Sequence, residues 1–89
     1  MTAIINFNNG IFTYEAEKKF MVRTSKDAPE EDWKTALAQD IKPVPKGTDL
    51  VVDHILHNFY GTYLCTEYNG KMYNIDPRNC DFVGIITAR

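Results

Sequence analysis

Residues 64–75 read LCTEYNGKMYNI, and this stretch decides the fold. Its centre, Asn69-Gly70, is the dipeptide favoured by two-residue type I′ hairpin turns, because both central residues need a positive φ. That turn pairs Tyr68 with Lys71 and Leu64 with Ile75. One face of the hairpin then carries Leu64, Thr66, Tyr68, Tyr73 and Ile75, and the other carries Tyr63, Cys65, Glu67, Met72 and Asn74. Because both faces mix apolar and polar groups, the pattern favours bent strands of a small barrel over a flat sheet.

A second hairpin is predicted around Asn9-Gly10. A two-residue turn there pairs Asn8 with Ile11, Phe7 with Phe12, Asn6 with Thr13, and Ile5 with Tyr14. The four large apolar side chains fall on one face, and Asn6 and Thr13 fall on the other. A shift of one residue would destroy this separation, so the pattern supports an N-terminal hairpin.

Further strands are expected at 20–24, 50–57 and 82–87, because these runs are rich in β-branched and aromatic residues. In the middle run, Leu50, Val52, His54 and Leu56 share one side by alternation. Asp76-Pro77-Arg78-Asn79 predicts a tight turn or one 3₁₀ turn, because Pro77 presets φ.

One helix is expected near 28–41, inserted between the two β segments. Asp27 is placed to cap it, and Glu30 completes a capping-box pattern. Trp33, Ala36, Leu37 and Ile41 form an apolar stripe at helical spacing. The stripe predicts docking of the helix on the sheet; the alternative is a helix displayed to a partner. The acidic residues 27 and 30–32 are typical of a solvated helix start.

Residues 45–84 resemble an SH3-like barrel. The resemblance is carried by Lys46-Gly47-Thr48-Asp49-Leu50-Val51-Val52, by the hairpin at Asn69-Gly70, and by the step from Tyr73-Asn74-Ile75-Asp76-Pro77-Arg78-Asn79 into Cys80-Asp81-Phe82-Val83. It implies architecture alone, because the aromatic pair of peptide-binding SH3 domains is not evident after the first strand. The predicted fold is thus mainly β (α+β): one domain over 1–89, with an N-terminal β-hairpin, one inserted helix and a small bent SH3-like barrel.

Charge and composition restrict the partners. The 89 residues include 10 Lys and Arg against 12 Asp and Glu, and only Lys18-Lys19 places two basic residues together. Duplex-binding domains concentrate basic residues on one face, so we expect no duplex nucleic acid. No signal peptide and no apolar run of about 20 residues is evident. We therefore expect a cytoplasmic protein, with no membrane contact and with Cys65 and Cys80 as free thiols.

Metal-binding and catalytic residue types are present without a matching pattern. His54 and His57 stand at an odd spacing on a strand, which sends their rings to opposite faces, and no CxxC accompanies them. A small hydrolase would use His54 or His57 as the base, oriented by Asp53, Asp76 or Asp81. The local sequence supports no such set, so we expect no catalytic residues, no metal and no cofactor.

The most suggestive stretch is 58–63, NFYGTY, which places two aromatic residues beside a glycine in a loop. Exposed tyrosines suit interfaces, because they offer a large rigid area with a polar tip. The alternative is that Phe59 and Tyr63 plug one end of a barrel. The candidate binding residues are Phe59, Tyr60, Tyr63, Tyr68, Lys71, Tyr73 and Arg78.

Surplus aromatic residues without a catalytic set favour a non-catalytic binding module, a small adaptor or inhibitor that docks on another protein. Compact chains of this kind are typical of phage and mobile-element accessory proteins. The alternative is an oligomeric binder of a nucleotide-like small molecule, held between tyrosines near Lys71, Lys46 or Arg78, with a pocket shared across a symmetric interface. A small hydrolase is the third hypothesis.

Overall fold

The computed structural model describes residues 2–15 and 18–86, without the side chains of Thr2, Ala3 and Trp33. The described part is mainly β, as predicted. Its elements are β1 (Thr2–Phe7), β2 (Gly10–Glu15), β3 (Lys19–Thr24), α1 (Trp33–Gln39), β4 (Asp49–Asn58), β5 (Gly61–Tyr68), β6 (Lys71–Ile75), the 3₁₀ turn η1 (Pro77–Asn79) and β7 (Cys80–Ile86). All the expected strands and the turn at 76–79 are confirmed; position 87, the expected end of the last strand, lies outside the described residues.

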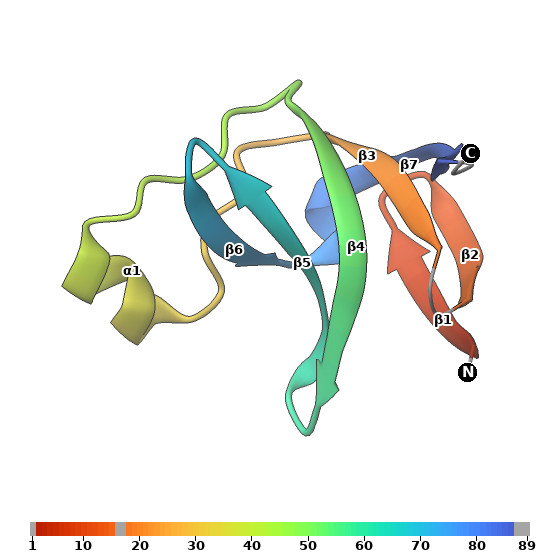
Figure 1. The fold of residues 1–89 in the computed structure, drawn as a ribbon, viewed down its shortest axis with the longest axis horizontal. Coiled ribbons are helices and arrows are strands. Elements are labelled where there is room, and N and C mark those ends of the chain that lie inside the picture. Colours follow the sequence, from red (N-terminus) through yellow and green to blue (C-terminus); the bar gives the residue numbers. More distant parts are fainter. Residues whose placement is uncertain (1, 16–17, 87–89) are drawn as a thin grey trace.

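Five strands form one antiparallel sheet in the order β6-β5-β4-β3-β7 (Figure 1). The chain winds from β3 to β6 and then returns through η1, so that β7 pairs with β3. β1 and β2 form a separate two-stranded sheet beside β3 and β7. Within the described residues β6 does not pair with β7, so the sheet is not closed into a barrel.

The β5–β6 hairpin has the predicted register. Tyr68 pairs with Lys71 and Leu64 with Ile75, and the φ angles of Asn69 and Gly70 are 53° and 80°. Both central residues therefore have the positive φ that this turn requires. The local sequence was therefore sufficient to predict the register of this hairpin.

The register predicted for the N-terminal hairpin is wrong by two residues. The turn is centred on Asn8-Asn9, and Phe7 pairs with Gly10. Gly10 has a φ of 141°, while neither asparagine has a positive φ. A shift of two residues keeps every side chain on its face, so the predicted separation survives: Ile5 and Phe7 are buried, while Ile4 and Asn6 are exposed.

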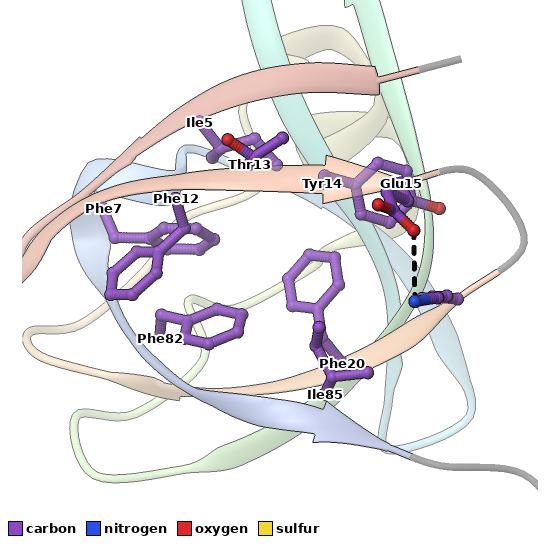
Figure 2. A pocket seen from close by; sticks show the side chains of 10 residues that line it. Ile5, Phe7, Phe12, Thr13, Tyr14, Glu15, Phe20, Phe82 and Ile85 are labelled. Atoms are coloured by element: carbon purple, nitrogen blue, oxygen red, sulfur yellow. Dashed lines mark ion pairs between the residues drawn. The ribbon is translucent and has the colours of Figure 1, made fainter.

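A cluster of aromatic rings joins this hairpin to the main sheet. In Figure 2 the rings of Phe7 and Phe12 face Phe82 from β7 and Phe20 from β3. Phe12 stacks on Phe82 with the ring centroids 4.3 Å apart, and Phe7 meets Phe20 edge-on at 6.0 Å. The cavity left between them is about 20 Å³. Since about 10–15 Å³ is needed for one water, this cluster is packed core rather than a ligand site.

Alternation predicted the facing of β4 correctly only as far as Val52. Val52 pairs with Thr66 and His54 with Cys65, so Asp53 is an extra residue, a β-bulge. A bulge reverses the facing of the residues after it, so Ile55 packs on the core while His54 and Leu56 are exposed. The prediction that His54 and Leu56 share the side of Leu50 is therefore wrong.

The helix is shorter than the predicted 28–41, and the capping box at Asp27 is wrong. Asp32 caps α1 by accepting from the N–H groups of Lys34 and Thr35, while Ala28 pairs with Val44 in a β-bridge. Glu30 is buried, and its carboxylate accepts the N–H of Asn74 at 2.8 Å. It thereby occupies the free edge of β6, which local sequence does not reveal.

The predicted apolar stripe of the helix is only partly buried. Ala36 packs on the core and Ile41 is buried, but Leu37 is 74% exposed. The side chain of Trp33, expected to dock the helix, lies outside the described residues. Figure 1 shows α1 beside β6, away from the β1–β2 hairpin. Of the described side chains of the stripe, Ala36 and Ile41 therefore contribute to docking and Leu37 does not.

Candidate functional site

The β4–β5 turn presents two aromatic side chains, Phe59 and Tyr60, which we call the aromatic turn. Asn58 pairs with Gly61 across it, and Figure 1 shows this hairpin projecting beyond the other strands. Phe59 is 96% exposed and Tyr60 is 85% exposed. The idea that Phe59 plugs a barrel end is therefore wrong. Large apolar side chains at such exposure are typical of contact surfaces.

The turn is held by few contacts of its own. The N–H of Tyr60 donates to Oδ1 of Asn58 at 2.8 Å, and the two rings meet edge-on with centroids 5.8 Å apart. Gly61 has a φ of 145°, a conformation that side-chain-bearing residues rarely adopt. The backbone is thus fixed by Asn58 and Gly61, and the aromatic rings are not needed for it.

Two grooves flank the aromatic turn, and Tyr60 and Tyr63 border both. The helix-side groove has a volume of about 590 Å³ and is lined by Glu31, Asp32, Lys34, Leu56, Asn58, Tyr60, Tyr63 and Asn74. The hairpin-side groove has a volume of about 310 Å³ and is lined by Ile4, Asn6, Tyr60, Gly61, Thr62, Tyr63, Asp76, Pro77 and Arg78. Both volumes fall within the range of about 300–1,000 Å³ that ligand sites occupy.

Arg78 enters the hairpin-side groove already paired. Its guanidinium contacts the Asp76 carboxylate, with Nη2 at 2.7 Å from Oδ2 and Nε at 3.1 Å from Oδ1. This hydrogen bonding from Arg78 lowers the pKa of Asp76, which also caps η1. Arg78 is therefore a positioned side chain whose charge is largely balanced.

Two carboxylates, those of Glu31 and Asp32, line the helix-side groove. Burial raises the pKa of Glu31, and the negative charges of Asp76 and Glu30 add to the effect. Glu30, behind it, accepts three hydrogen bonds from uncharged donors: the N–H of Asp32, and the N–H and Nδ2 of Asn74. The helix-side groove therefore carries a locally negative charge.

The structure separates the other predicted residues from this site. Tyr68, Lys71 and Tyr73 lie toward the opposite end of the β5–β6 hairpin. Tyr73 is buried, and its hydroxyl donates to the carbonyl of Lys42 at 2.6 Å. Nζ of Lys71 donates to the carbonyl of Gln39 at 3.4 Å. These side chains fasten the connection between β3 and β4. Of the seven candidates, Phe59, Tyr60, Tyr63 and Arg78 remain at the site.

Sequence reasoning missed two apolar residues of the grooves, Ile4 and Leu56. Ile4 is 70% exposed, and its place on the face of Asn6 was a signal that could have identified it. Leu56 is 42% exposed because the bulge at Asp53 turns it outward. Alternation alone gave no such signal.

The residue types considered for chemistry lie elsewhere. Nδ1 of His54 lies 2.9 Å from Asp53, and Nδ1 of His57 lies 2.7 Å from the hydroxyl of Thr62; both pairs are exposed. Cys65 and Cys80 are buried and not joined in a disulfide, and burial raises the pKa of Cys80 to about 12. Because the thiolate is the reactive form, Cys80 is held in an unreactive state at neutral pH. Within 2–15 and 18–86, no three His, Cys, Asp or Glu side chains gather as a metal site.

Comparison with known proteins gives no family. The chain matches no protein-family model, no curated protein and no solved structure. In the described part of the chain, no helix has the length and apolar character to cross a membrane.

Proposed function

We propose that this protein is a non-catalytic binding module, a small adaptor or inhibitor, that docks on another protein through the aromatic turn and its two grooves. The observation that carries the proposal is the exposure of Phe59 and Tyr60 at a turn whose backbone does not need them. Two side chains fixed by nothing but each other gain most from contact with a partner.

The energy available is adequate for specific docking. Burying a large apolar side chain contributes about 1.5–3 kcal/mol, and aromatic side chains dominate the energetics of many interfaces. Leu56 and Ile4 extend the apolar area into the two grooves. Interfaces concentrate their binding energy in a few central side chains surrounded by weaker contacts, and this arrangement supplies both parts.

The architecture supports an SH3-like fold as the finer form of this proposal. β4, β5, β6 and most of β7 come from residues 45–84, and a 3₁₀ turn precedes β7 as expected, but β3 from outside this range lies between β4 and β7 and completes the sheet. In that fold, with β3 as its first strand, the aromatic turn would join the second and third strands. An experimental structure in which β6 and β7 lie too far apart to continue one barrel would contradict this interpretation.

The docking proposal is tested by affinity capture from the source cells with the full chain as bait. The test variant is Phe59→Ser/Tyr60→Ser, and the control is Leu37→Ser, since Leu37 is 74% exposed on α1. We expect a stoichiometric partner with the wild type and the control, and its loss with the double variant. A partner retained equally by all three proteins would overturn the role of the aromatic turn.

A second candidate function is binding of a nucleotide-like small molecule in the hairpin-side groove. It is favoured by Tyr60, Tyr63 and Arg78 lining one groove of about 310 Å³. Lys71, considered for this role, lies at the other end of β5–β6. A ligand that binds only the folded protein raises its melting temperature by mass action. A nucleotide and cyclic-nucleotide panel that leaves the melting temperature unchanged would remove this candidate.

A further inference from the structure

We propose that the partner inserts a basic segment, bearing arginine or lysine, into the helix-side groove, with its cation at Glu31 and its apolar stem over Tyr60 and Tyr63. This inference rests on the docking function proposed above and adds the chemistry of the partner. It derives from the charge and the apolar lining of the groove taken together.

The Glu31 carboxylate is available to a partner. Glu31 is exposed at the groove, and its backbone N–H is committed to the carbonyl of Asn74 at 2.9 Å. None of the hydrogen bonds and ion pairs found among the described residues uses its carboxylate. The backbone of Glu31 is thus fixed beside β6, and its side chain lines the groove without a hydrogen bond or ion pair to another described residue.

The nearby charges are not balanced within the chain. Glu31 and Asp32 line the groove, and the carboxylates of Glu30 and of Asp76, which lines the neighbouring groove, lie close enough to act on Glu31. Lys34, which also lines the groove, acts on Asp32, and Lys26 acts on Asp76. Arg78 is ion-paired with Asp76, and its charge also acts on Glu31 without contacting it. Glu30 and Glu31 remain as an adjacent pair, and Glu30 is bonded only to uncharged donors. A positive side chain from outside would supply what this pair lacks.

The raised pKa of Glu31 supports the same conclusion. Its causes are partial burial and the like charges of Asp76 and Glu30, which disfavour the ionised form and outweigh the opposing positive charge of Arg78. A cation placed against Glu31 would reverse this effect. An acidic segment would be repelled by the same three carboxylates, and a neutral one would leave them uncompensated.

The apolar lining of the groove suits the rest of a basic side chain. Tyr60, Tyr63 and Leu56 form its apolar walls. Guanidinium and ammonium groups are attracted to the faces of aromatic rings, and their alkyl stems pack along apolar surface. An aromatic wall next to unpaired carboxylates therefore recognises arginine or lysine better than any other side chain.

The test is selection from a displayed library of random peptides against the immobilised full chain. We expect the enriched peptides to carry arginine or lysine, and to be lost when Phe59→Ser/Tyr60→Ser is the bait. For the best peptide, fluorescence anisotropy should show that Glu31→Gln weakens binding about fivefold, which is the scale of a partly exposed ion pair. A peptide analogue with citrulline, the neutral isostere of arginine, should lose about the same factor in affinity. The Leu37→Ser protein should bind the original peptide with unchanged affinity.

The outcomes separate this inference from the docking proposal. Enrichment of neutral or acidic peptides that still require Phe59 and Tyr60 would overturn the basic segment and leave docking standing. Equal binding of the arginine and citrulline peptides, or an unchanged affinity of Glu31→Gln, would overturn it as well. Peptides that bind the Phe59→Ser/Tyr60→Ser bait as well as the wild type, or the absence of any enriched peptide, would count against both the basic segment and the docking proposal. Urea unfolding of Glu31→Gln serves as the folding control.

Discussion

In the β1–β2 turn Phe7 pairs with Gly10 across Asn8-Asn9, and in the β4–β5 turn Asn58 pairs with Gly61 across Phe59-Tyr60. The φ angles of the two glycines, 141° and 145°, are nearly equal, and none of the four central residues has a positive φ. The two turns therefore share a loop length, a glycine position and a range of backbone angles. They differ in what surrounds them.

The asparagine turn is bonded to β7. Oδ1 of Asn9 accepts the N–H of Phe82 at 2.9 Å, and Nδ2 of Asn9 donates to the carbonyl of Phe82 at 3.0 Å. Asn8 adds a backbone bond to Cys80 and a side-chain bond to Asp81. The side-chain amide of Asn9 thus makes the pair of hydrogen bonds that a neighbouring strand would make with the edge strand β7. Among the described residues the aromatic turn has no such hydrogen bonds to another strand, and this difference is the reason for the proposed docking role.

The largest effect should come from Asn9→Ala. It removes two hydrogen bonds, those to the N–H and the carbonyl of Phe82, and each typically contributes about 0.5–1.5 kcal/mol. We expect urea unfolding to show a loss of about 2 kcal/mol, with Phe59→Ala as the unaffected control. A loss no larger than that of the control would mean that water replaces Asn9 and that the two turns are equally unsupported.

The next largest loss of stability should be equal for two glycine substitutions, one in each turn. Gly10→Ala and Gly61→Ala each force a side-chain-bearing residue into a rarely adopted φ, at a cost of about 1 kcal/mol. The added Cβ meets its nearest side-chain atom at an ordinary 3.6 Å and 3.8 Å, so crowding adds little. Gly84→Ala is the control, because Gly84 has no positive φ and nothing within 4 Å of such a Cβ. Unequal losses at Gly10 and Gly61 would show that the two backbones are not equivalent.

The ion pair of Asp76 and Arg78, in the hairpin-side groove beside the aromatic turn, should make the stability of the protein depend on pH. Because Arg78 lowers the pKa of Asp76 in the folded protein, ionised Asp76 stabilises the fold. That contribution is complete above the ordinary carboxyl value of 3.8 and is lost as pH falls through the lower folded pKa. Asp76→Asn should therefore cost about 0.8 kcal/mol at neutral pH and progressively less as the pH falls below 3.8. A difference in unfolding free energy that stays constant with pH would contradict this assignment.

The smallest effect on stability should come from exchanging one turn sequence for the other. Phe59→Asn/Tyr60→Asn copies the asparagine turn onto the β4–β5 hairpin and should change the free energy of unfolding by less than about 0.5 kcal/mol. The same variant should lose the captured partner. A marked destabilisation would show instead that the aromatic pair is structural, and it would remove the main support for a docking function.

Local patterns predicted the elements better than their connections to one another. The positive φ angles at Asn69-Gly70 fixed the β5–β6 register, because both residues obey a rule of the turn itself. Asn9-Gly10 has the same letters but a different register, because Asn9 is engaged by β7, which lies more than 70 residues further along the chain. Likewise Glu30 has the spacing of a helix cap, yet it bonds to Asn74 at the edge of β6.

The candidate site divides in the same way. Surplus aromatic residues beside a glycine identified Phe59, Tyr60 and Tyr63, since these are adjacent in sequence. Arg78 joins them through η1. Lys71 and Tyr73 instead donate to carbonyls of the β3–β4 connection, and Tyr68 packs on the core. Ile4, Leu56 and Glu31 come from three other segments, and only the fold brings them to the same two grooves.

By itself, the sequence determined the strands, the 3₁₀ turn, one hairpin register and the aromatic character of the β4–β5 turn. These depend on backbone sterics and on the alternation of neighbouring side chains. Only the tertiary structure decided which asparagine and which glutamate would occupy the edges of the sheet, and where a bulge would reverse the facing of β4. It also decided that Glu31 and Tyr63 border one groove. The physical reason is that hydrogen bonds and charges act between groups that are close in space, whatever their separation along the chain.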